Sequence, residues 1–130
     1  ILNHGLSDKN ITYKPHKIYG ENTGGTIWGH DGREKFTQDY DEISEFKTLD
    51  YLCETKIIKE QIGYIHLDVE THEPEALKGA LITLNKYKPI LSIECTSSKD
   101  SNLYKRIIKT LPKFYKLNQQ IYNQFIFIAE

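Results

Sequence analysis

The second half of the chain alternates apolar, strand-like runs with helix-like stripes. Residues 62–69 are mostly apolar, which predicts a strand buried on both faces. Residues 71–87 predict a helix, because apolar side chains recur there at helical spacing and form one stripe. These side chains are Ala76, Leu77, Ala80, Leu81 and Leu84. Pro74 fits the first turn of this helix, and Pro89 ends it.

The same alternation continues to the end of the chain. Residues 89–95 predict a second buried strand, and residues 102–111 predict a second helix. Residues 114–117 and 125–129 predict two closing strands, with the polar run at 118–120 between them. An antiparallel pair is therefore expected at the end of the chain.

The first half carries weaker signals. Residues 1–6 and 11–13 read as short extended pieces, and residues 26–28 as a brief strand. Residues 43–49 also predict a strand, although their alternation is loose. A short helix through Cys53 follows, and either Thr48 or Asp50 is expected to cap it.

A glycine-rich segment spans residues 20–32. It reads as a loop around the brief strand. Its Asn-Thr-Gly-Gly stretch at residues 22–25 lacks the lysine and the strand-to-helix context of a phosphate-binding loop, so a turn is expected there.

Strands alternating with helices indicate an α/β fold, and 130 residues fit one domain. Two buried strands joined by a helix require a parallel crossover, for which a right-handed connection is the rule. Ligands of open α/β sheets collect beyond the carboxyl ends of the strands. This rule points to residues 68–70 and 94–96, where both strands end in acids.

Composition narrows the possible partners. The formal net charge is −1, so the chain lacks the basic excess of a general nucleic-acid binder. No apolar run is long enough to cross a bilayer, and no signal peptide is recognisable, so no membrane partner is expected. Cys53 and Cys95 lie outside any zinc-binding spacing and predict reduced thiols of a cytoplasmic protein.

Three carboxylates are expected to converge at the strand ends. Asp68 and Glu70 would share a face if the strand continued, and Glu94 ends the neighbouring strand. One interpretation is a site for a polar ligand, an amine or a metal, since clustered acids repel one another unless something compensates them. The other is that Asp68 and Glu70 cap the following helix.

Two histidines lie beside these acids. Alternation puts His66 on the same face as Asp68, where it is either a buried, hydrogen-bonded histidine or a general base. His72 stands at the expected start of the helix, where a solvated capping role competes with a role in the site.

Several segments together resemble one known family. Residues 65–80 are similar to the signature of FkbM-type methyltransferases, an apolar strand followed by Asp-Val-Glu-Gly-x-Glu, an apolar pair and Lys-Gly-Ala. Residues 48–52 resemble the family's Thr-Leu-Asp-x-Leu segment, and residues 89–94 its Pro-x-x-x-x-Glu strand. Residues 5–8 resemble its Ala-Leu-Ser-Asp segment, and residues 22–25 its glycine-containing turn. The five matches occur in the family's order.

The resemblance implies a Rossmann-like class I methyltransferase sheet with S-adenosylmethionine as the cofactor of the complete domain. It implies methyl transfer to a hydroxyl oxygen of a sugar or another small acceptor. Asp68 and His66 are then the candidates for the catalytic base. Glu70, Glu94 and His72 would contact the acceptor. Ser7, Asp8 and Asp68 would contact the cofactor.

The chain departs from the family pattern in two ways. Thr71 replaces the glycine after Asp-Val-Glu, which suggests an altered backbone at the pocket. The family's N-terminal strands and glycine-rich loop would precede residue 1, and the chain has no methionine. Residues 1–130 are therefore interpreted as a single partial methyltransferase domain, which alone is expected to be inactive. Its exposed sheet edge is expected to favour a homodimer.

Two alternatives stay open from the sequence. The first is a metal-dependent hydrolase that holds Mg²⁺ on Asp68, Glu70 and Glu94. A nuclease version is weakened because Thr96, and not lysine, stands two residues after Glu94. The second is a non-catalytic binding or dimerisation module.

Overall fold

The computed structural model describes residues 2–13, 15–17, 26–28, 44–95 and 101–130. Its helices are α1 (Leu49–Glu54), α2 (Glu73–Lys78), α3 (Leu81–Tyr87) and α4 (Asn102–Thr110). Its strands are β1 (Gly5–Leu6), β2 (Ile11–Tyr13), β3 (Pro15–Lys17), β4 (Thr26–Trp28), β5 (Ser44–Lys47), β6 (Tyr64–Leu67), β7 (Ile90–Glu94), β8 (Tyr115–Ile121) and β9 (Gln124–Ala129). The predicted α/β composition is confirmed.

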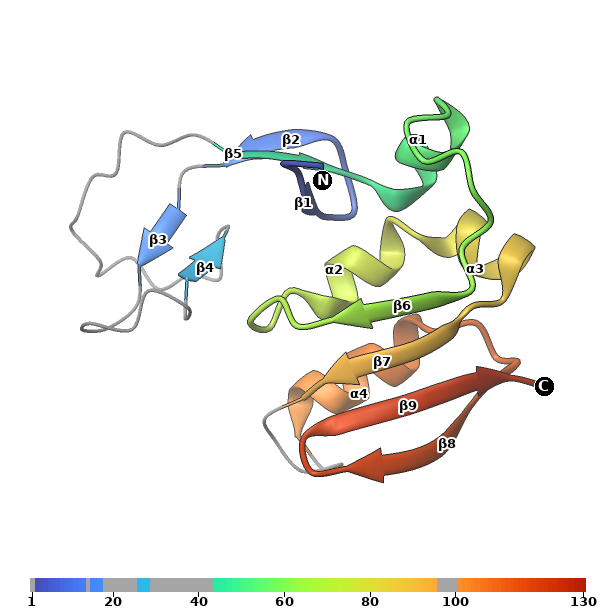
Figure 1. Cartoon of the computed structure of the whole chain (residues 1–130). Coiled ribbons are helices and arrows are strands. Elements are labelled where there is room, and N and C mark those ends of the chain that lie inside the picture. Colours follow the sequence, from blue (N-terminus) through green and yellow to red (C-terminus); the bar gives the residue numbers. More distant parts are fainter. Residues whose placement is uncertain (1, 14, 18–25, 29–43, 96–100) are drawn as a thin grey trace.

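The strands form three sheets within these ranges, with the orders β1-β5-β2, β3-β4 and β6-β7-β9-β8. Figure 1 shows the four-stranded sheet in the lower part of the view, with β1, β5 and β2 above it. The brief strand expected at residues 26–28 is confirmed, whereas the expected turn at 22–25 lies outside the described residues.

The four-stranded sheet contains the two strands with the strongest sequence signal. β6 pairs in parallel with β7, and Leu67 lies opposite Ile93. β9 pairs antiparallel with β7 and with β8, which closes the sheet as expected. Because β6 pairs only with β7 in the described part of the chain, its other side is an edge of the sheet.

One apolar core joins this sheet to α2, α3 and α4. Its innermost members are fully buried, and burial of each Leu, Ile or Phe side chain contributes about 1.5–3 kcal/mol. They are Leu77, Leu84, Leu91, Ile93, Ile107, Phe125 and Phe127. Burial of both faces of β7 explains why its sequence is a continuous apolar run.

The long helix predicted over residues 71–87 is wrong, because the structure divides it into α2 and α3. The Asp50 carboxylate accepts hydrogen bonds from the backbone N–H groups of Ile82 (3.0 Å) and Thr83 (2.7 Å). The Gly79 carbonyl accepts one from the N–H of Asp50 at 2.9 Å. The Asp50 side chain, which is distant in sequence, thus caps α3 and stabilises the break between α2 and α3. Thr48, and not Asp50, caps α1 through Tyr51 N–H at 3.0 Å.

The closing strand pair is longer than the sequence indicated. The polar residues 118–120, expected to separate the strands, lie within β8. Ile121 pairs with Gln124, so the turn consists of Tyr122 and Asn123, and Tyr122 has a φ of 53°. The outward position of β8 at the sheet edge explains the polar residues, since its exposed side chains need no apolar partner.

The length and apolar character of the helices bear on whether the chain can span a membrane. Within the described ranges, no helix combines the length and the apolar character that a membrane span requires.

A glycine fixes the contact between α2 and the N-terminal segment. A Cβ atom added at Gly79 would lie 1.9 Å from the Ser7 carbonyl oxygen. The neighbour is backbone, so it cannot swing away as a flexible side chain would. Only glycine allows this close approach of Ser7 to the end of α2.

We expect Gly79→Ala to destabilise the chain by about 1–3 kcal/mol, because the added methyl group must push two backbone segments apart. Urea unfolding followed by circular dichroism measures this change. Gly63→Ala is the matched control, since a Cβ atom there meets nothing within 4 Å. Equal stability of the two variants would show that Ser7 does not pack against Gly79.

Candidate functional site

The carboxyl ends of β6 and β7 bring two acids together. The parallel register places Leu67 opposite Ile93, so Asp68 and Glu94 follow at the same edge of the sheet. Their carboxyl groups are hydrogen-bonded to each other. Glu94 Oε1 also accepts a hydrogen bond from Asn123 Nδ2 in the turn between β8 and β9. Two carboxyl groups can bond in this way only while one of them holds a proton.

This proton is reflected in the pKa of Glu94. The hydrogen bond to Asp68 is the largest cause that raises this pKa, followed by burial and by the negative charges of Asp68, Glu70 and Glu73. The predicted convergence of Asp68, Glu70 and Glu94 therefore has an electrostatic consequence. Glu73 belongs to the same group, because its charge also raises the pKa of Glu94. We call Asp68, Glu70, Glu73 and Glu94 the acidic edge.

Glu70 belongs to the acidic edge, but it lies in a turn and not in a continued strand as expected. β6 ends at Leu67, and Glu70 and Thr71 follow in a turn with φ values of 50° and 77°. The expectation that Asp68 and Glu70 share the face of a continued strand is therefore wrong. The capping interpretation also fails, because α2 begins after the N-cap residue His72 without a side-chain capping hydrogen bond.

Thr71 is strained by this turn. A β-branched residue rarely adopts a positive φ, and the left-handed region disfavours non-glycine residues by roughly 1–2 kcal/mol. The sequence motif expects glycine at this position, and the backbone explains why. The strain lies directly beside the acidic edge.

Glu73 is the site residue that the sequence interpretation missed. Its side chain is only 2% exposed. Oε1 accepts a hydrogen bond from Val69 N–H at 3.2 Å, while Oε2 has no hydrogen-bond partner among the described residues. Burial raises the pKa of this carboxyl, and nearby backbone N–H groups partly oppose the rise. Glu73 is the last acid of the segment that resembles the Asp-Val-Glu-Gly-x-Glu signature.

The two histidines occupy different surroundings. His66 is exposed on β6, so the interpretation as a buried histidine is wrong, while its role as a base stays a prediction. His72 is half-buried, its Nε2 lies 3.1 Å from Ser7 Oγ, and its ring contacts the Phe46 ring edge-on. Burial is the main cause that lowers the pKa of His72.

Ser7 and Asp8 link the N-terminal segment to the start of α2. Ser7 is fully buried, and its N–H donates to the Lys47 carbonyl at 3.1 Å. Its hydroxyl oxygen lies between His72 and Asp8 Oδ1, the latter at 3.4 Å. Asp8 is exposed. The Ser7 hydroxyl therefore serves a contact within the protein.

The acids at this edge do not form a metal cage. No three His, Cys, Asp or Glu side chains among the described residues are grouped so that they could hold a metal ion. Glu94 instead accepts a hydrogen bond from Asn123, and the neighbouring acids raise its pKa.

Comparisons with known proteins identify the family of the chain and a similar fold. The family model described as the methyltransferase FkbM domain matches residues 2–120, so the chain belongs to this family. A search of curated proteins finds no match. Among solved structures, the chain is similar to a methyltransferase FkbM from Methylobacillus flagellatus KT, with 17% sequence identity and a TM-score of 0.54. The match covers 97% of this chain and 27% of that one, so this chain spans about a quarter of its length.

The raised pKa of Glu94 predicts how the stability depends on pH. The folded chain binds more protons than the unfolded chain above the usual value of 4.5. The stability contributed by the proton on Glu94 is therefore fully present below about pH 4.5 and is lost as pH rises through the raised pKa. Glu94→Gln keeps both hydrogen bonds without a charge, so its stability should fall less between pH 4.5 and 8 than that of the wild type.

Urea unfolding at several pH values tests this expectation. Glu73, whose pKa is also raised, leaves a residual slope in the Glu94→Gln variant. Glu60→Gln, at an exposed position outside the acidic edge, should keep the wild-type slope. If Glu94→Gln and the wild type lose stability in parallel, the pKa of Glu94 is not raised in the folded chain.

Proposed function

We propose that the whole protein is an S-adenosylmethionine-dependent methyltransferase that methylates a hydroxyl oxygen of a sugar or another small molecule. Membership in the FkbM family supports the reaction class. The observation that carries the proposal for this chain is the acidic edge, which lies where ligands of parallel sheets collect. On this proposal, the chain contributes the acceptor side of the site.

We propose further that residues 1–130 are one partial domain with a Rossmann-like class I sheet. The parallel β6–β7 pair with its helical connection, followed by the antiparallel β8–β9 hairpin, supports this interpretation. The free side of β6 is where a further parallel strand of such a sheet would pair.

The residues of the acidic edge fit this cofactor. Four acids at one edge repel one another, and Glu73 Oε2 is buried without a partner among the described residues, so a nearby positive charge would stabilise them. S-adenosylmethionine, when bound, supplies a methyl group on a positively charged sulfur. Asp68 would hold it from the acidic edge and Asp8 from the exposed N-terminal segment. The Ser7 hydroxyl is engaged by His72, so its contribution would be to position Asp8.

The acceptor hydroxyl must lose a proton during the transfer. Asp68 is the proposed base, because its carboxyl lies beside that of Glu94 at the sheet edge where ligands of parallel strands collect. The exposed His66, two residues earlier on β6, is the alternative base. Glu70 and Glu94 would accept hydrogen bonds from other hydroxyl groups of the acceptor. His72 would act by fixing the start of α2.

Asp68→Asn should lower kcat by about 10²–10⁴, because the amide cannot take up the hydroxyl proton. Methyl transfer from radiolabelled S-adenosylmethionine to sugar acceptors, measured with the whole protein, tests this. His66→Gln should change kcat less than Asp68→Asn if Asp68 is the base. Glu60→Gln is the control, at an exposed position away from this edge. Wild-type kcat in Asp68→Asn would refute the assignment of the base.

A dimerisation module is the second candidate, because β6 presents a free edge with Tyr64 58% exposed. Such edges pair with other strands, so a homodimer through β6 is proposed for this chain. A metal-dependent hydrolase has less support, since the described acids are not grouped as metal ligands.

Sedimentation equilibrium distinguishes dimerisation through β6 from a monomer. Tyr64→Lys should shift the chain toward a monomer, because lysine at a strand edge opposes pairing. Ile121→Lys is the matched control, since Ile121 is a 48% exposed apolar residue on the opposite edge strand, β8. Equal association of both variants would exclude β6 as the interface.

A further inference from the structure

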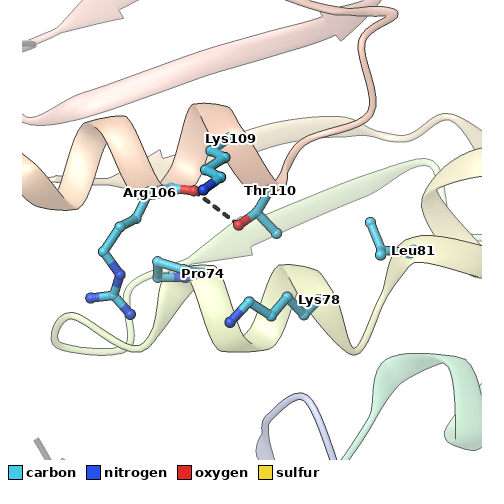
Figure 2. A pocket seen from close by; sticks show the side chains of 6 residues that line it. All are labelled: Pro74, Lys78, Leu81, Arg106, Lys109 and Thr110. Carbon is cyan, nitrogen blue, oxygen red and sulfur yellow. Dashed lines mark hydrogen bonds between the residues drawn. The ribbon is translucent and has the colours of Figure 1, made fainter.

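A groove of about 430 Å³ lies between α2 and α4, apart from the acidic edge (Figure 2). Side chains of α2, α4 and the start of α3 line it: Pro74, Lys78, Leu81, Arg106, Lys109 and Thr110. Nothing in the proposed methyl transfer uses these residues. The groove therefore needs an explanation of its own.

The groove carries an excess of positive charge. Lys78, Arg106 and Lys109 line it, and Glu75 is the acid that reaches them. Lys109 forms no ion pair with any residue that the structure describes. α4 contains no acid between Asn102 and Thr110, so its own neighbours three or four positions away cannot compensate these cations.

The cations already converge on one oxygen atom. Glu75 Oε1 lies 2.7 Å from Arg106 Nη2 and 3.7 Å from Lys78 Nζ. This arrangement shows that the Arg106 and Lys78 side chains can bind one oxyanion together. One carboxylate leaves the third cation, Lys109, without a counter-charge in the part of the chain that the structure describes.

Apolar side chains that line the groove strengthen such binding. Pro74 is buried and Leu81 is partly exposed, so apolar surface lies beside the charged rim. Charges next to apolar surface interact more strongly than charges surrounded by water. A guanidinium and two ammonium groups within one small groove suit a group with two negative charges more than a single carboxylate.

We propose that the groove between α2 and α4 binds the dianionic phosphate group of a phosphate ester. The phosphate would contact Lys109 and Lys78 and compete with Glu75 for Arg106. A soluble phosphorylated molecule and the headgroup of an anionic lipid share this chemistry. The proposal does not depend on the methyl-transfer reaction.

Calorimetric titration of the chain with inorganic pyrophosphate, at constant ionic strength, tests the site. Lys109→Gln should weaken binding roughly fivefold or more, because it removes the uncompensated cation. Glu75→Gln should tighten binding roughly severalfold, because it frees Arg106 and Lys78 from an internal competitor. Thermal unfolding of each variant verifies that the fold is kept.

Lys59→Gln is the matched control, since it removes the same charge from an exposed position outside the groove. It should leave the affinity unchanged. Equal weakening by Lys59→Gln and Lys109→Gln, or no tightening by Glu75→Gln, would overturn the proposal, because binding would then follow net charge alone.

Vesicle sedimentation identifies the source of the phosphate. Vesicles of phosphatidylcholine with phosphatidic acid are compared with vesicles of phosphatidylcholine alone. Binding that Lys109→Gln weakens, in either the pyrophosphate or the phosphatidic acid experiment, supports the site and assigns the phosphate to a soluble molecule or a lipid. Absence of binding in both experiments would overturn it.

Discussion

The parallel register between β6 and β7 is the constraint on which the site depends. It places Asp68 and Glu94 side by side at one sheet edge, where their charges repel. The chain relieves this repulsion through the raised pKa of Glu94, which favours its neutral form, and through a hydrogen-bond donor from Asn123. Neither device compensates Glu70 or the buried Glu73. The edge is thus left with an excess of negative charge that a cationic or hydroxylated ligand can satisfy.

The second constraint is the junction that surrounds Gly79. Asp50 binds two backbone N–H groups of α3, and its own N–H binds the Gly79 carbonyl. The same glycine admits Ser7 to the end of α2, and Ser7 in turn bonds His72 at the start of that helix. The N-terminal segment therefore contacts α2 at both ends of the helix. Its contacts fix the helix whose first residue, Glu73, completes the acidic edge.

The sequence predicted the parallel strand pair and the meeting of Asp68 with Glu94, because both follow from apolar runs and from chain direction. The break between α2 and α3 was not predictable in the same way. The apolar stripe continues across it, and the cause is the Asp50 side chain, which lies about thirty positions earlier. The function of Glu73 was hidden for a similar reason, since only packing shows that this acid is buried and one oxygen has no partner.

Helix α2 connects the acidic edge to the groove that faces α4. Glu73, in its first turn, belongs to the edge, whereas Lys78, in its last turn, and Glu75 belong to the groove. His72 responds to the groove and to the N-terminal segment: Glu75 and Asp8 favour its protonated form, while Arg106 and Lys78 oppose it. An anion in the groove would cancel part of the opposing charge and so favour protonation of His72. The charges of the groove and the hydrogen bond between His72 and Ser7 are therefore electrostatically coupled through one short helix.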